Sequence, residues 1–195
     1  MRNNKTALSI FALLVIAISV SICSCKSSES DSESTSAASS YISETEKIEM
    51  AYRQELNFAL SASSDQTDES AIKEHVDRLK TIDENGAERQ GVSFVEYNAK
   101  LSENGSLVVE GYLRNFSGSD IYNIECNITA QNSETQEYVA TKSLRFFVSP
   151  ENASFSLENK KSCPVTITFD ADYVNVDEAD LSKLSFTSEF TYNQK

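Results

Sequence analysis

The chain of 195 residues has no tryptophan, one histidine, two prolines and five glycines. A single imidazole leaves little for histidine-based acid–base catalysis or zinc coordination, and we interpret His75 as a packed or half-exposed residue. The sequence also lacks a phosphate-binding glycine loop, a G-x-S-x-G turn, an H-E-x-x-H motif and a dinucleotide fingerprint. These absences predict a protein that is not an enzyme and that carries no cofactor.

Basic residues are scarce as well. The chain has 17 of them against 30 acidic residues, which gives a net charge of −13. Removal of residues 1–24, which include Arg2 and Lys5, leaves 15 basic and 30 acidic residues and a net charge of −15. Nucleic acid and anionic lipid surfaces both attract proteins with a basic patch. The composition therefore argues against nucleic acid as a partner and favours a well-dispersed surface protein.

Residues 1–24 have the pattern of an export signal. Arg2 and Lys5 precede an apolar run that is shorter than the roughly 20 residues of a membrane span. Ile22, Ser24 and Cys25 fill the aliphatic, small and cysteine positions of the bacterial lipobox, which this segment resembles. The resemblance implies that Cys25 becomes an acylated N-terminus, which holds the protein on the extracellular face of the cell membrane. An ordinary secreted protein and an uncleaved anchor are the alternatives.

Two cysteines, Cys126 and Cys163, lie in the chain after the signal and the lipobox. A disulfide between them is compatible with an extracellular location. Two buried free thiols are equally compatible with the sequence, because the sequence does not give the distance between the two residues. Both alternatives stay open at this point.

Residues 25–42 predict a flexible tether. The stretch from 27 to 40 contains eight serines and three acidic residues, and it has almost no apolar surface to bury. Such a segment separates a folded domain from the membrane and carries no chemistry of its own.

Residues 43–86 predict a helical hairpin. Ser43 and Glu46 have the spacing of a capping box, so we expect a first helix over 43–62. A second helix is expected over 68–84, with Asp68 as its N-cap. The apolar faces are thin, so the hairpin must pack on the next domain or on a partner.

The region 92–193 changes to alternating apolar and polar residues, the pattern of half-buried strands. Turn residues separate the segments. Cys126 and Cys163 both fall on the inward set, and Pro164 predicts an edge strand or a strand start because it has no N–H. We expect an α+β protein in which the hairpin precedes an antiparallel immunoglobulin-like β-sandwich of about seven strands. The expected strands are 93–101, 107–114, 122–129, 138–148, 153–157, 163–169 and 184–192.

The segment from Asn104 to Asn115 reads N-G-S-L-V-V-E-G-Y-L-R-N. It resembles the G-x-L-V-V-x-G-x-x-R-N opening of SLAP domains, the S-layer-assembly-associated modules of Gram-positive bacteria, and 180–186 resembles their closing D-L-S motif. The likeness covers about residues 92–192, and FxLYD-type extracellular modules are near relatives. It implies a non-catalytic binding or assembly module at the cell surface, with a cell-surface protein or a wall polymer as partner.

A different function is a small carbohydrate-active hydrolase that uses paired carboxylates. A pocket with two close acids and exposed aromatic side chains would favour it. Tyr112, Tyr122 and Tyr138 are the aromatic candidates for such a pocket.

A third possibility is a calcium-dependent adhesion module. Its ligands would be Asp170, Asp172, Asp177 and Asp180. The segment departs from an EF-hand loop, because Asn175 stands at the glycine position and Leu181 at the final glutamate position. The alternative is an acidic connection in which Asp177 caps a short helical turn.

Overall fold

The computed structural model describes residues 42–60, 68–148 and 155–195. Residues 1–41, with the predicted signal, Cys25 and nearly all of the predicted tether, lie outside the described residues. The described parts contain two α-helices and six β-strands, an α+β arrangement with most of its core in the sheets. In chain order the helices and strands are α1 (Glu44–Glu55), α2 (Glu69–Glu84), β1 (Gly91–Leu101), β2 (Leu107–Phe116), β3 (Ile121–Asn132), β4 (Tyr138–Phe146), β5 (Lys161–Phe169) and β6 (Leu184–Gln194).

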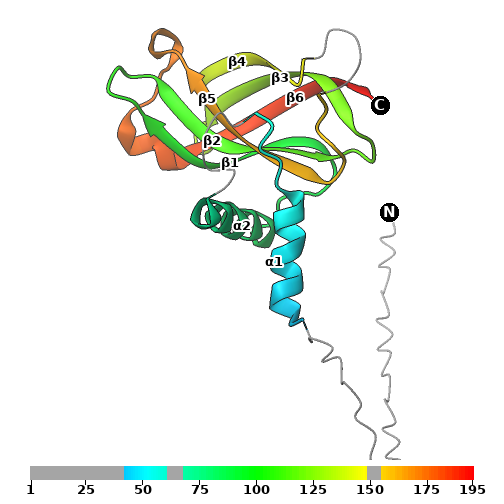
Figure 1. Cartoon of the computed structure of the whole chain (residues 1–195). Helices are drawn as coiled ribbons and strands as arrows, with labels where there is room; N and C mark the ends of the chain where they lie inside the picture. Colours follow the sequence, from blue (N-terminus) through cyan, green and yellow to red (C-terminus); the bar gives the residue numbers. More distant parts are fainter. Residues whose placement is uncertain (1–41, 61–67, 149–154) are drawn as a thin grey trace, which may run out of the picture. The chain divides into compact units, whose positions relative to one another are not determined.

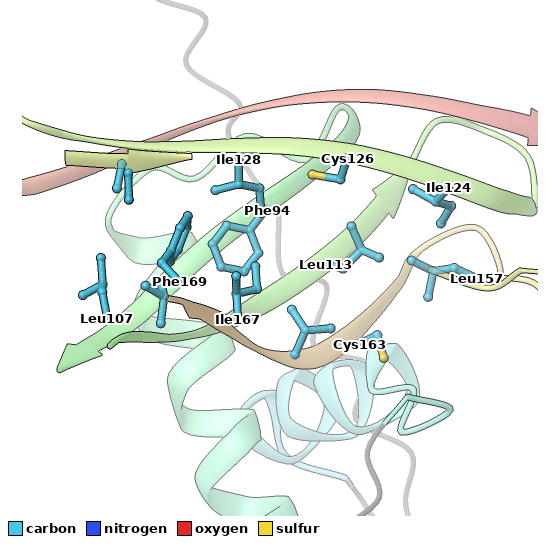
Figure 2. Packing of buried hydrophobic residues seen from close by; sticks show 14 of the residues in the cluster. Phe94, Leu107, Leu113, Ile124, Cys126, Ile128, Leu157, Cys163, Ile167 and Phe169 are labelled. Atoms are coloured by element: carbon cyan, nitrogen blue, oxygen red, sulfur yellow. The ribbon is translucent and has the colours of Figure 1, made fainter. Parts of the chain in front are cut away.

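The strands form two antiparallel sheets of three strands each, in the orders β1–β2–β5 and β4–β3–β6 (Figure 1). Side chains alternate along each strand, so one face of each sheet contributes to a shared hydrophobic core. Figure 2 shows Cys126 and Ile128 of β3 facing Leu113 of β2 and Ile167 of β5 across this core. The apolar residues that alternate along the strands in the sequence are thus the residues that form the core.

Six expected strands are confirmed, with ends that shift by a few residues. The seventh, over 153–157, falls partly outside the described residues. Of its described part, Leu157 forms an isolated antiparallel bridge with Ile121. Pro164 lies in β5, which is an edge strand as its missing N–H predicts.

Helix α1 begins where the sequence predicts. The Ser43 N–H donates to Glu46 Oε2 at 2.8 Å, and the Glu46 N–H donates to Ser43 Oγ at 3.2 Å, which is the capping box. The expected extension to residue 62 is wrong, because the helix ends at Glu55. Leu56 turns to extended backbone and pairs in parallel with Ser162, and the Asn57 N–H donates to the Ser162 carbonyl at 2.9 Å. Pairing of Leu56 and Asn57 with the free edge of β5 therefore replaces the next helical turn.

Helix α2 is confirmed with its Asp68 cap, whose carboxylate accepts from the Ser70 N–H at 2.8 Å. Leu79 and Ile82 pack on Tyr112, which points outward from β2. Figure 1 shows α1 and α2 on the side of the β1–β2–β5 sheet that faces away from the other sheet. The connection 61–67 lies outside the described residues, so the hairpin itself stays an interpretation.

Candidate functional site

The outer face of the β1–β2–β5 sheet carries an ion-pair cluster in which Arg114 and Glu55 are buried, Asp83 is mostly buried and Arg89 reaches the surface. Arg114 has no exposed surface; it donates from Nη2 to Glu55 Oε1 at 2.9 Å and from Nη1 to Asp83 Oδ1 at 2.8 Å. Arg89 donates to the remaining oxygens, to Glu55 Oε2 at 2.7 Å and to Asp83 Oδ2 at 2.8 Å. Each carboxylate therefore accepts from both guanidinium groups. The cluster fastens the last turns of α1 and α2 to β2.

Two hydroxyl groups complete the ion-pair cluster. Tyr52 donates to Asp83 Oδ2 at 2.8 Å, and Ser162 donates to Glu55 while it accepts from Arg114 Nε at 3.2 Å. Burial, with the nearby Asp83 carboxylate, raises the pKa of Tyr52 to about 12. Burial alone would raise the pKa of Asp83, but hydrogen bonds from Arg114, Arg89 and Tyr52 outweigh burial and lower the Asp83 pKa from 3.8. The arrangement stabilises a fixed pattern of charge between the helices and the sheet.

His75 and Tyr112 lie in the same helix–sheet interface. The Tyr112 hydroxyl is 2.7 Å from His75 Nδ1, and the Phe58 ring packs edge-on against the imidazole at 5.6 Å between centroids. Tyr112 is fully buried, and burial raises its pKa. The half-buried His75 agrees with the interpretation of a packed residue. Tyr112 is not the exposed aromatic that the hydrolase hypothesis requires.

The β4–β3–β6 sheet has a different outer face, which we call the open face because its side chains are exposed. Strand register arranges six of these side chains as two rows, each of which crosses all three strands. One row is Arg145, Glu125 and Thr191, and the other is Ser143, Asn127 and Glu189. We call these six residues the polar grid.

The polar grid is held by cross-strand contacts at the surface. The Arg145 guanidinium lies 2.6 Å from the Glu125 carboxylate, and the two side chains are 72% and 54% exposed. Ser143 Oγ donates to Asn127 Oδ1 at 2.6 Å. Glu189 and Thr191 are exposed on β6, beside Asn127 and Glu125 respectively. The grid thus offers carboxylate, guanidinium, amide and hydroxyl groups to an external ligand.

The open face is hollowed at the polar grid. A hollow of about 420 Å³ is lined by all six grid residues together with Cys126 and Leu144. A second hollow of about 310 Å³ shares Glu125 and Arg145 with the first and adds Asn123 and Val148. The two hollows form a shallow trough along this part of β3 and β4. We take the polar grid and its trough as the candidate binding site.

Among the residues proposed from the sequence, Cys25 lies outside the described residues. Cys126 and Cys163 are both buried free thiols, one in each sheet (Figure 2). Burial raises the pKa of Cys126 to about 12 and that of Cys163 to about 11. Both thiols are therefore protonated and unreactive at neutral pH.

The acidic segment after β5 forms two 3₁₀ helices, Ala171–Tyr173 and Glu178–Lys183. Asp177 is the N-cap of the second one, as expected, although its side chain makes no capping hydrogen bond. Asp180 forms an ion pair with Lys183 at 3.3 Å. Within the described residues no group of three or more acidic, histidine or cysteine side chains is arranged to hold a metal ion, and this includes Asp170, Asp172, Asp177 and Asp180.

Sequence reasoning missed both the ion-pair cluster and the polar grid. The alternation over 107–114 puts Arg114 on the side of β2 away from the core but does not identify its partner. Glu55, a charged residue one helical turn after Tyr52 on the same face of α1, is a weak sequence signal for that partner. For the grid, the alternation over 122–129 indicates which residues of β3 point outward, but their neighbours on β4 and β6 depend on strand register. A single sequence specifies that register only weakly.

No family model matches the chain, and no curated protein is similar to it in sequence. Across the described ranges, neither α1 nor α2 has the length and apolar character required to cross a bilayer.

Proposed function

We propose that the chain is a membrane-anchored extracellular lipoprotein of a Gram-positive bacterium, in which acylated Cys25 holds a non-catalytic binding or assembly module at the cell surface. The lipobox-like residues Ile22, Ser24 and Cys25 support the anchor, and the serine-rich stretch after them supports a spacer. The partner is a surface component that reaches the module from outside the membrane, either a protein or a wall polymer.

The module itself is proposed to be an immunoglobulin-like sandwich of the SLAP type, preceded by a helical hairpin. Two antiparallel sheets around one core and the motif-like strand β2 are consistent with this assignment. The buried Arg114 occupies the arginine position of the G-x-L-V-V-x-G-x-x-R-N pattern. In this proposal that arginine is a structural residue that holds the helices on the sheet.

One observation carries the binding proposal: the two outer faces differ in accessibility. Around Tyr112 and Arg114 the β1–β2–β5 face is covered by α1 and α2 through the ion-pair cluster. The β4–β3–β6 face is polar, exposed and hollowed at the grid. A sheet that presents polar side chains from hydrogen-bonded strands is suited to recognition, because its backbone loses little conformational entropy when a ligand binds to it.

The anchor is tested by mass spectrometry of the mature N-terminus. We expect a diacylglyceryl group on Cys25, and we expect the Cys25→Ala variant to appear unmodified in the medium or as an unprocessed precursor.

The binding proposal is tested by photo-crosslinking on intact cells. A photoreactive residue at position 143 on the open face should capture a partner, whereas one at the exposed position 98 of β1 should not. Equal capture from both positions, or from neither, would contradict the proposal.

A second function, the carbohydrate-active hydrolase, is favoured by one observation. Glu125 and Glu189 line the same hollow on adjacent strands, and they are diagonal neighbours in the register. The backbones of such neighbours lie roughly 7–8 Å apart, so their carboxylates can adopt the separation of roughly 6.5–9.5 Å that inverting glycosidases use. Incubation with cell-wall polysaccharide and measurement of new reducing ends distinguishes the two functions. Release that Glu189→Gln abolishes would establish the hydrolase.

A further inference from the structure

The polar grid is a regular array. Its two rows follow the hydrogen-bonding direction of the sheet, in which adjacent strands lie about 4.8 Å apart. Along each strand the rows are two residues apart, which corresponds to roughly 7 Å. A linear polymer that lies across the strands can therefore contact the polar side chains of β4, β3 and β6 in succession.

The chemistry of the grid suits hydroxyl groups. The carboxylates of Glu125 and Glu189 accept hydrogen bonds, the Arg145 guanidinium donates them, and the Asn127 amide and the hydroxyls do both. A sugar hydroxyl is itself both a donor and an acceptor, so it can pair with any of these groups. An apolar ligand would leave this set unpaired at a free-energy cost.

The net charge of the polar grid favours neutral polymers over anionic ones. Two carboxylates and one guanidinium give the grid a net negative charge, and the chain after residue 24 carries a net charge of −15. A polyanion such as a phosphate-containing polymer or nucleic acid is repelled by this surface. A peptide that adds to a sheet pairs with an edge strand, which here is β4 or β6, and it would not lie over the grid, whose central strand β3 is paired on both sides.

We propose that the polar grid binds an extended, neutral glycan, which lies across β4, β3 and β6 so that successive sugars meet successive strands. This inference rests on the proposed function as a surface-binding module and names its ligand class. The second hollow, which continues along β3 and β4 from Glu125 and Arg145 to Asn123 and Val148, widens the site beside the first row. The lining residues of the grid include the carboxylates of Glu125 and Glu189 but no aromatic ring on which a sugar could stack. Glycan binding there depends on hydrogen bonds, so each grid residue should contribute measurably to the binding free energy.

The test titrates the ¹⁵N-labelled full-length lipoprotein, in phosphocholine micelles, with chitohexaose and separately with cellohexaose. The two neutral β-linked probes differ in the acetamide group. We expect saturable shifts in the amides of residues 125–127, 143–145 and 189–191, and no comparable shifts in β1. Dextran sulfate of similar length serves as the anionic comparison and should produce no saturable shifts at the grid.

Two variants on the same face of β3 sharpen the test. Asn127→Ala should weaken the binding of the responsive probe about tenfold, which corresponds to the loss of one hydrogen bond. Gln131→Ala, at a half-buried amide near the end of β3 on the same face and outside the trough, should change the affinity less than twofold. Both variants should keep the thermal midpoint of the parent, because their side chains are not buried.

The outcomes separate this inference from the proposed function. Failure of both neutral probes to bind, with continued crosslinking from position 143 on cells, would overturn the glycan ligand and keep the surface-binding module. Equal weakening by Asn127→Ala and Gln131→Ala would also overturn the site. Binding followed by cleavage of a probe would support the ligand class and overturn the non-catalytic function. Loss of all capture on cells would overturn the proposed function itself.

Discussion

The two sheets bury their inner faces in the same way but use their outer faces differently. On β2 the outward residues Tyr112 and Arg114 are completely buried, because α1 and α2 lie over them. On β3 the outward residues Glu125 and Asn127 are exposed. Both strands show the same period of two in sequence. Exposure of an outward residue is therefore decided by what covers the sheet and not by the strand pattern.

The contrast is sharpest in two arginine–glutamate pairs. Arg114 and Glu55 are 0% and 6% exposed at 2.9 Å, whereas Arg145 and Glu125 are 72% and 54% exposed at 2.6 Å. The distances are similar, but water screens the second pair and not the first. The buried pair joins a helix to a sheet, and the exposed pair leaves its groups accessible to a ligand.

The largest effect is expected from Arg114→Ala. Removal of this guanidinium leaves the Glu55 and Asp83 carboxylates with reduced compensation in a buried site, so we expect the free energy of unfolding to fall by about 3–5 kcal/mol. The matched variant Arg145→Ala on the open face should cost about 0.2–1 kcal/mol. Urea unfolding followed by circular dichroism measures both. Equal losses would show that the two faces do not differ in the way described.

A smaller effect is expected from Asp83→Asn, which should cost about 1.5–3 kcal/mol by weakening charge-assisted hydrogen bonds. The pKa of Asp83 is lower in the folded protein than its ordinary value of 3.8. The stability that it contributes is therefore full above pH 3.8 and is lost as the pH falls through the folded pKa. Unfolding curves at successively lower pH should show the parent approaching the variant. A gap that widens toward acid would contradict the sign.

Tyr52→Phe removes one hydrogen bond to Asp83 and should cost about 0.5–1.5 kcal/mol at neutral pH. The folded pKa of Tyr52 is raised from 10.0 to about 12, so its contribution is present below pH 10 and disappears between pH 10 and about 12. Thermal melts across this range should show the parent converging on the variant. Tyr138→Phe, at a residue that is 55% exposed, is the control for loss of a tyrosine hydroxyl and should cost less than about 0.5 kcal/mol at neutral pH.

The smallest effect on stability is expected from Ser143→Ala on the open face. Its hydroxyl donates to Asn127 at the surface, and surface substitutions usually change stability by less than about 0.5 kcal/mol. Chemical denaturation should place this variant within that range of the parent. A loss as large as that of Asp83→Asn would mean that the grid is a structural element and not a binding surface.

Features that depend on neighbouring residues were predictable from the sequence. The Ser43–Glu46 capping box and the Asp68 cap involve residues two or three apart, and both are confirmed. The edge position of Pro164 follows from its missing N–H. Alternation along the strands also assigned Cys126 and Cys163 to the interior, where both lie.

Features that depend on distant residues were not predictable. Helix α1 was expected to continue to residue 62, but pairing with Ser162 ends it at Glu55. The Arg114–Glu55 contact joins residues 59 positions apart, and no periodicity in either segment indicates the other. The polar grid needs the register of three strands at once, and a shift by one residue would replace its members with core residues.

The two outer faces can be compared in one measurement, by carboxyl footprinting of the full-length lipoprotein with a carbodiimide and an amine, with and without isolated cell walls. We expect Glu125 and Glu189 to be labelled in the free protein and protected when cell walls are added. Glu55 and Asp83 should stay unlabelled in both conditions, because their carboxylates face the sheet from α1 and α2 and are paired with Arg114 and Arg89. Rapid labelling of Glu55 and Asp83, or unchanged labelling of Glu125 and Glu189 when the walls are bound, would contradict the assignment of a covered face and a binding face.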